Sequence, residues 1–203
     1  MPYIDTGPSL KEVSDLLKPC PQQWWIAGGW AIDGFLGGVT RKHGDVDVAI
    51  LQREEAALRS YLDSQGIEVW PGLGNGQALD SPIHPGEQLP SGTKVLLCRT
   101  SPKDDWSFEC LINKTDENEW VFFNDDRVRR PLTEIGFVGQ DDIPYLNPEI
   151  VLLYKAKNRR DKDEYDFTLA APRLSKQARS WLAVSVGIVH PDHSWPSHLG
   201  QLG

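Results

Sequence analysis

Asp45 and Asp47 are separated by one residue inside an otherwise apolar segment, Asp-Val-Asp-Val-Ala-Ile-Leu. In a strand, alternate residues share a face, so both carboxylates lie on one face and Val46, Val48 and Ile50 lie on the other. Two like charges this close repel each other unless a cation lies between them. Carboxylate oxygens suit Mg²⁺, which usually takes one or two carboxylates together with substrate phosphate oxygens. The spacing therefore predicts a magnesium site.

Gly28 and Gly29 precede this acidic pair, between an expected strand at residues 24–27 and an expected short helix at 30–36. A Gly-Gly turn at a helix start can bring backbone N–H groups up to a phosphate. Taken singly, Asp-x-Asp is common in turns and surface strands, and Gly-Gly is usually only a tight turn. Their order and their spacing of about one supersecondary unit favour a phosphate site followed by a metal site.

The chain resembles the antibiotic nucleotidyltransferases of the polymerase-β-like superfamily, and most of all the aminoglycoside 2''-O-adenylyltransferases and the related lincosamide nucleotidyltransferases. The superfamily pattern is Gly-Gly or Gly-Ser, a short gap, Asp-x-Asp, and a third acid on a later strand. A second stretch, residues 144–167, is similar to the C-terminal part of many relatives. The residues that carry the main likeness are Gly28-Gly29-Trp30-Ala31-Ile32-Asp33 and Thr40-Arg41-Lys42-His43-Gly44-Asp45-Val46-Asp47.

The resemblance implies a third acid, and Glu109 is the candidate that the residues favour. In the expected strand 106–113, alternation places Phe108, Cys110 and Ile112 on one face and Glu109 on the other. An acid in the middle of a strand is unexpected without a partner cation. The alternatives are a solvated face of an edge strand for Glu109, or Asp80, Asp104 or Asp105 as the third acid; many relatives have Asp here.

Two groups of basic residues are candidates for binding the nucleotide. Arg41, Lys42 and His43 precede the acidic pair, where the resemblance places phosphate or acceptor contacts. A second group, Lys155, Lys157, Arg159, Arg160 and Lys162, lies near the end of an expected helix. Cations are common at helix C-termini and such runs are usually solvated. Lys155 is the candidate for the triphosphate, because it lies on the apolar helix rather than in the exposed run.

The periodicity predicts an α/β (α+β) chain, with a short mixed sheet flanked by helices and a helical C-terminal segment, and the resemblance implies that this is a nucleotidyltransferase fold. We expect a catalytic domain at 1–143 and the helical segment at 144–203. Residues 71–92 read as a long loop. Strands are expected at 24–27, 45–51, 67–70, 94–100 and 106–113, and helices at 10–17, 30–36, 53–65, 147–157, 162–170 and 175–187.

The composition limits the kinds of molecule that this chain is expected to bind. The 203 residues carry a net charge of −8, which disfavours a nucleic-acid groove and can attract a cationic small molecule, although it can equally serve solubility alone. The first residues lack a signal-peptide pattern and no apolar stretch reaches membrane length, so we expect a cytoplasmic protein without a membrane partner. The three cysteines are expected to be reduced and buried. The sequence indicates no oligomeric state.

Together these features predict transfer of AMP from ATP, with Mg²⁺, to a hydroxyl of a small acceptor, for which the resemblance implies an aminoglycoside or lincosamide antibiotic and a role in antibiotic resistance. Asp45, Asp47 and Glu109 are the expected metal ligands and catalytic residues, with Glu109 as base, ligand or both. Three alternatives stay open: AMP transfer to a protein, as in toxin–antitoxin pairs; a non-catalytic nucleotide-binding protein; and transfer to a metabolite that is no antibiotic.

Overall fold

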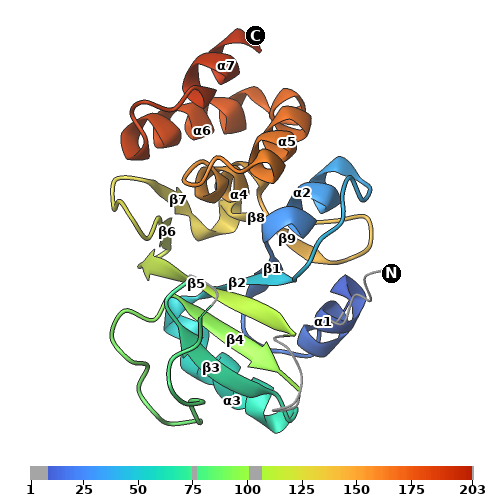
Figure 1. The fold of residues 1–203 in the computed structure, drawn as a ribbon, viewed down its shortest axis with the longest axis vertical. Helices are drawn as coiled ribbons and strands as arrows, with labels where there is room; N and C mark the ends of the chain where they lie inside the picture. Colours follow the sequence, from blue (N-terminus) through green and yellow to red (C-terminus); the bar gives the residue numbers. More distant parts are fainter. Residues whose placement is uncertain (1–8, 75–76, 101–106, 203) are drawn as a thin grey trace. The chain divides into compact units, whose positions relative to one another are not determined.

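The computed structural model describes residues 9–74, 77–100 and 107–202 (Figure 1). The chain forms two compact units. Unit 1 consists of Met1–Ile26 and Lys42–Thr115, and unit 2 consists of Ala27–Arg41 and Asp116–Gly203. Each unit is therefore built from two separate stretches of sequence. The expected division into domains 1–143 and 144–203 stays a prediction, and the compact units have other bounds.

Unit 1 is a mixed sheet with two helices. The strand order is β3-β4-β5-β2-β1, in which β2 and β5 are parallel and the other neighbouring pairs are antiparallel. The elements are α1 (Leu10–Leu17), β1 (Trp24–Ile26), β2 (Asp47–Leu51), the 3₁₀ turn η1 (Gln52–Glu54), α3 (Glu55–Ser64), β3 (Glu68–Gly72), β4 (Val95–Arg99) and β5 (Phe108–Asp116, whose last residue belongs to unit 2).

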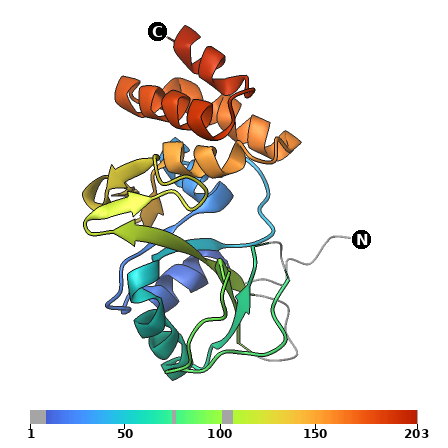
Figure 2. The same cartoon turned by 90° about the vertical axis from the view of Figure 1, so that its left-hand side faces the viewer.

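The core of unit 1 lies between the sheet and its two helices, α1 and α3 (Figure 2). Val48 and Cys110, partners on β2 and β5, are fully buried, as are Leu17 of α1 and Leu62 of α3. The Tyr61 hydroxyl of α3 donates a hydrogen bond of 2.5 Å to the carbonyl of Leu16 and ties the helices together. The sheet face that carries Asp47 is the opposite one, because side chains alternate along β2.

Unit 2 contains five helices and two β-hairpins among its described residues. The hairpins pair β6 with β7 and β8 with β9, both antiparallel. The elements are α2 (Gly28–Leu36), β6 (Glu119–Val121), β7 (Arg129–Pro131), η2 (Leu132–Glu134), β8 (Gly136–Val138), β9 (Pro144–Leu146), α4 (Pro148–Lys155), α5 (Asp161–Ala170), η3 (Ala171–Arg173), α6 (Lys176–Val189) and α7 (Trp195–Gln201).

Aromatic side chains form much of the core of unit 2. The rings of Trp120, Phe122, Tyr154 and Trp181 lie within 5.0–6.3 Å of their neighbours in the group, measured between ring centroids. Burial raises the pKa of Tyr154. Aromatic pairs at such distances add about 0.5–1.5 kcal/mol each beyond the area they bury. Packing of this kind joins the β6–β7 hairpin to the C-terminal helices.

The close packing of Gly34 against the Tyr145 ring in unit 2 leads to a prediction about stability. A Cβ at Gly34 of α2 would lie 2.8 Å from the Tyr145 ring, which the hydrogen bond from its hydroxyl to Asp141 Oδ2 (2.6 Å) holds in place. Helix propensity favours Ala over Gly by about 1 kcal/mol, but overpacking costs about 1–3 kcal/mol. We expect Gly34→Ala to lower the free energy of unfolding, measured with urea. Gly38→Ala is the control, because nothing lies within 4 Å of that position; equal effects in both variants would contradict the prediction.

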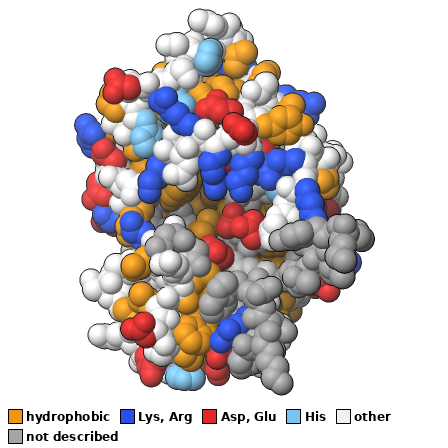
Figure 3. Space-filling view, in the orientation of Figure 1, with side chains coloured by type: hydrophobic (Ala, Val, Ile, Leu, Met, Phe, Trp, Pro, Cys, Tyr) orange, Lys and Arg blue, Asp and Glu red, His pale blue; other side chains and the backbone are white. Residues whose placement is uncertain are grey.

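Several expectations from the sequence can be compared directly with the structure. The mixed sheet and the helical C-terminal part are confirmed, and Cys20, Cys98 and Cys110 are buried free thiols. The strand expected at 45–51 begins at Asp47, so Asp45 precedes it. Within the described ranges no helix is long and apolar enough to span a bilayer. Acidic and basic side chains are interspersed on the face shown in Figure 3.

Candidate active site

The parallel pairing of β2 with β5 brings two of the candidate acids together in unit 1. Asp47 is the register partner of Glu109, and the next pairs, Val48 with Cys110 and Ala49 with Leu111, follow in step. Register partners on neighbouring strands point to the same face, and the strands lie about 4.7–4.9 Å apart. Asp47 and Glu109 therefore stand side by side, each partly exposed, on the face away from α1 and α3.

Asp45 lies beside this pair although it precedes the strand. The Glu109 N–H donates a hydrogen bond of 3.0 Å to the carbonyl of Val46, so the backbone is already paired one residue before β2 begins. Burial raises the pKa of Glu109, and the negative charge of Asp45 raises it further. Glu109 is therefore linked to Asp45 by charge and to Asp47 by strand register, at the ends of two neighbouring strands.

The donor set fits a divalent cation of the magnesium class. All three groups offer hard carboxylate oxygens, and their mutual repulsion is relieved when a cation binds between them. Within residues 9–74, 77–100 and 107–202, no group of three or more His, Cys, Asp or Glu side chains is arranged to hold a metal by itself. Magnesium is usually bound by one or two carboxylates and completes its shell with water and substrate phosphates, so two carboxylates of this group are a sufficient protein contribution.

The rival third acids do not share this position. Asp80 is exposed in a segment that runs along β3, where the Leu79 N–H donates to the Pro71 carbonyl at 2.7 Å. Since β3 and β4 lie between that segment and β5, its backbone is about three strand spacings, or ~14 Å, from β5. Asp104 and Asp105 lie outside the described residues. Glu109 is thus the candidate that the sheet places beside Asp47.

Gly28 and Gly29 begin helix α2, two residues earlier than the helix expected from the sequence. Gly28 has a φ of +58°, a left-handed conformation that glycine adopts without a steric penalty. Its place at the start of a nine-residue helix gives backbone N–H groups that point along the helix axis. The expected phosphate role of this turn stays a prediction.

The structure places the four predicted basic residues in different surroundings. Lys42 is exposed and His43 is buried in unit 1. Arg41 of unit 2 forms a two-pronged ion pair with Asp166, and the Lys155 ammonium lies 2.9 Å from Asp166 and 3.2 Å from Asp163. Arg41 and Lys155 are therefore matched by buried carboxylates of helix α5, and their contact with a nucleotide stays a prediction.

Asp163 and Asp166 were missed by the sequence interpretation. Both carboxylates are essentially inaccessible to solvent, at 0% and 1% exposure. Together with Phe167 and Ala170 they occupy positions i, i+3, i+4 and i+7 of α5, which form one helix face. Two acids on the otherwise apolar stripe of a helix were the available signal for a buried charge cluster.

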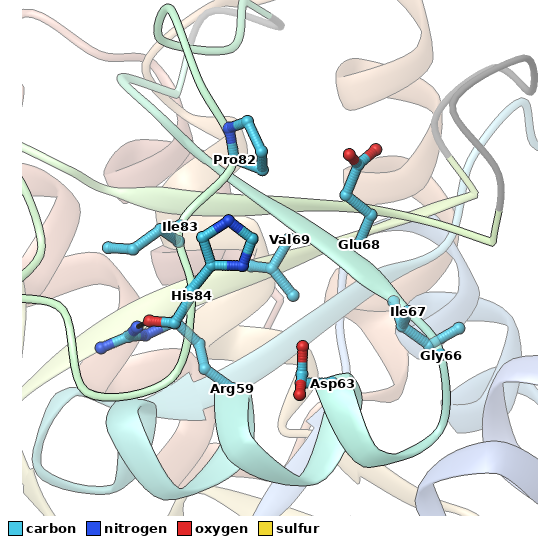
Figure 4. A pocket seen from close by; sticks show the side chains of 9 residues that line it. All are labelled: Arg59, Asp63, Gly66, Ile67, Glu68, Val69, Pro82, Ile83 and His84. Atoms are coloured by element: carbon cyan, nitrogen blue, oxygen red, sulfur yellow. Dashed lines mark hydrogen bonds between the residues drawn. The ribbon is translucent and has the colours of Figure 1, made fainter.

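A surface pocket of about 210 Å³ lies elsewhere in unit 1, between α3 and the edge strand β3 (Figure 4). Its lining residues are Arg59, Asp63, Gly66, Ile67, Glu68, Val69, Pro82, Ile83 and His84. The Arg59 guanidinium is used structurally, since it donates to Glu55 and to the carbonyls of His84 and Glu87 at 2.8 Å each. Because β4 separates β3 from β5, this pocket is distinct from the carboxylate group.

Solved structures share the fold. ANT(2'')-Ia in complex with adenylyl-2''-tobramycin is 16% identical, with a TM-score of 0.56 over 89% of this chain and 96% of that chain. The lincosamide antibiotic adenylyltransferase LnuA, bound to lincomycin, is 16% identical, with a TM-score of 0.51 over 79% of this chain and 92% of that chain. At these identities the likeness concerns the fold alone, which is a nucleotidyltransferase fold.

Sequence comparisons find relatives that match part of this chain. A 2''-aminoglycoside nucleotidyltransferase of Escherichia coli is 42% identical over 52 residues, and one of Klebsiella pneumoniae is 44% identical over 45 residues. These matches span 26% and 22% of this chain and only 29% and 25% of the relatives. The profile of the aminoglycoside-2''-adenylyltransferase family matches residues 9–114, more than half of the chain. The chain therefore belongs to the aminoglycoside-2''-adenylyltransferase family.

Proposed function

We propose that this chain is a Mg²⁺-dependent nucleotidyltransferase that transfers AMP from ATP to a hydroxyl of a small-molecule acceptor. The observation that carries the proposal is the register of β2 with β5, which sets Asp47 beside Glu109 on one face of the sheet. Asp45 is close enough to raise the pKa of Glu109. Paired acids of which one has a raised pKa are typical of catalytic sites.

Each acid has a distinct role in the proposed reaction. Asp45 and Asp47 hold the cation, which when bound neutralises the charge that develops on the leaving pyrophosphate. Glu109 accepts the proton of the acceptor hydroxyl while the hydroxyl oxygen forms a bond to the α-phosphorus and the bond from that phosphorus to pyrophosphate breaks. A raised pKa makes the Glu109 carboxylate a stronger base than an exposed glutamate. Positioning and electrostatics supply most of the remaining rate.

The acceptor that fits this chain best is a cationic antibiotic of the aminoglycoside class. The curated relatives are 2''-aminoglycoside nucleotidyltransferases, and the similar ANT(2'')-Ia structure contains adenylyl-2''-tobramycin. A net charge of −8 favours the approach of a polycation over that of an anionic acceptor. A lincosamide is the second acceptor class in the proposal, and the biological role would be antibiotic resistance.

A turnover screen tests the function. ATP, GTP, CTP and UTP are each incubated with Mg²⁺ and with an aminoglycoside, a lincosamide or no acceptor, and pyrophosphate release is measured. We expect release only with ATP and an antibiotic, a gain of one AMP unit in the acceptor's mass, and loss of both on chelation of Mg²⁺. ATP binding without pyrophosphate release for any acceptor would favour a non-catalytic binding protein, and AMP appearing on a protein would favour the toxin–antitoxin alternative.

The phosphate role of Gly28 and Gly29 belongs to the same proposal and has its own prediction. Gly28 is a poor test site, because its φ of +58° strains any substituted side chain whatever it binds. We expect Gly29→Val to weaken ATP binding, measured by calorimetry, since its side chain occupies space that phosphate oxygens need. Gly38→Val, at an open position, is the control. Unchanged ATP affinity in a folded Gly29→Val protein would show that the phosphates do not bind at this turn.

A further inference from the structure

Unit 2 contains a buried cluster of opposite charges that the proposed reaction does not use. Its acidic members Asp33, Asp163 and Asp166 are 4%, 0% and 1% exposed. Its basic members are Arg41 and Lys155, and the half-exposed Arg160 pairs with Asp163 at its edge. Buried charges persist only when they are paired and hydrogen-bonded. The cluster joins the loop after α2 to helices α4 and α5.

Asp166 is the centre of the cluster. Arg41 donates from Nε to Asp166 Oδ1 at 2.8 Å and from Nη2 to Oδ2 at 2.9 Å. Lys155 lies 2.9 Å from Oδ2. Burial acts to raise the pKa of Asp166, but the hydrogen bonds and charges of Arg41 and Lys155 outweigh it and hold that pKa below its ordinary value. The paired contact of a planar guanidinium with a carboxylate fixes the orientation of both groups.

Thr40, the residue before Arg41, is also fixed by hydrogen bonds. The Thr40 N–H and hydroxyl both donate to Asp33 Oδ1, at 3.1 and 2.5 Å, and the Tyr165 hydroxyl of α5 lies 3.4 Å from the Thr40 carbonyl. Two consecutive residues of the loop are thus bound to α2 and α5 by side-chain hydrogen bonds. Asp45 follows Arg41 after only three intervening residues, so the chain between them can extend at most about 14 Å.

We propose that Arg41 is a positioning residue, which its pairing with Asp166 holds in place so that the segment leading to Asp45 and Asp47 starts from a fixed point. The inference rests on the proposed function for its effect on catalysis, and it replaces the nucleotide contact expected for Arg41.

The test compares Arg41→Gln, Asp166→Asn and the double variant. If Arg41 contacts the nucleotide, Arg41→Gln should lose ATP affinity and Asp166→Asn should not. If Arg41 is a positioning residue, both single variants should lower kcat, by up to about 10²-fold, since a misplacement of ~1 Å has that effect. The double variant should be no worse than either single one, while the calorimetric affinity for ATP stays within about twofold. Arg41→Lys keeps the charge without the two-pronged geometry and should recover part of kcat.

Glu149→Gln is the matched control, because Glu149 of α4 forms another buried ion pair of unit 2, with Arg130. It should lower the thermal midpoint without changing kcat. Hydrogen exchange of residues 40–46 gives a readout that needs no turnover, with faster exchange expected in Asp166→Asn and not in Glu149→Gln. If the wild type transfers no AMP, the proposed function fails and the exchange result still decides the anchoring. Unchanged exchange, or a loss of ATP affinity confined to Arg41→Gln, would overturn the inference.

Discussion

Asp47→Asn is expected to abolish turnover while leaving the fold intact. Asparagine keeps the size of the side chain but removes the negative charge that Asp47 adds beside Glu109 at the start of β2. Loss of one group that stabilises developing charge costs about 10²–10³ in rate, and loss of a metal ligand adds to it. We expect less than about one thousandth of the wild-type pyrophosphate release with Mg²⁺ as the only divalent cation.

Asp80→Asn is the matched control for Asp47→Asn. Asp80 is exposed and lies in the segment beside β3, away from β5. It should retain the wild-type rate, and circular dichroism should show the same thermal transition for both variants. Near-wild-type turnover in Asp47→Asn, or equal losses of turnover in the two variants, would contradict the assignment of Asp47 as a metal ligand.

The elements with strong local signals were predicted well from the sequence. The capping box of Ser9 and Glu12 opens α1, and Pro148 at the first turn opens α4. The hairpins β6–β7 and β8–β9 were missed, because strands of three residues are too short to show an alternating pattern. The division into units was not predicted either: residues 27–41 join a unit whose other part begins at Asp116, and local patterns carry no information on such long-range association.

The candidate site shows the same difference between local and long-range information. Alternation indicated that Glu109 lies opposite Phe108 and Cys110, but the pairing with Asp47 depends on the parallel alignment of β2 with β5, which are separated in sequence by α3, β3 and β4. The charge cluster was missed for a related reason. The position of Asp166 on the apolar face of α5 indicated burial, but its partner Arg41 lies 125 residues away and is brought to it only by the fold.

Glu109→Gln is expected to have opposite effects on activity and on stability. As general base, Glu109 accepts a proton that glutamine cannot accept, and loss of a positioned base lowers the rate by about 10²–10⁴. Calorimetric affinity for ATP should change little. If Glu109 only ligates the metal, high Mg²⁺ should restore the rate, so a titration of kcat against Mg²⁺ concentration separates the two roles.

The stability effect follows from the raised pKa of Glu109, which burial and the charge of Asp45 cause. Because the folded protein holds this proton more tightly than the unfolded chain does, the wild type loses stability as pH rises from the ordinary glutamate pKa through the raised one. Glutamine has no such charge, so with a chelator present at neutral pH the variant should unfold at a higher temperature than the wild type, and the difference should shrink as the pH is lowered. A variant that matches the wild type in both stability and activity would mean that Glu109 is an ordinary surface acid, because neutralising an exposed acid changes neither property. A variant that is less stable at neutral pH would contradict the predicted repulsion between Glu109 and Asp45.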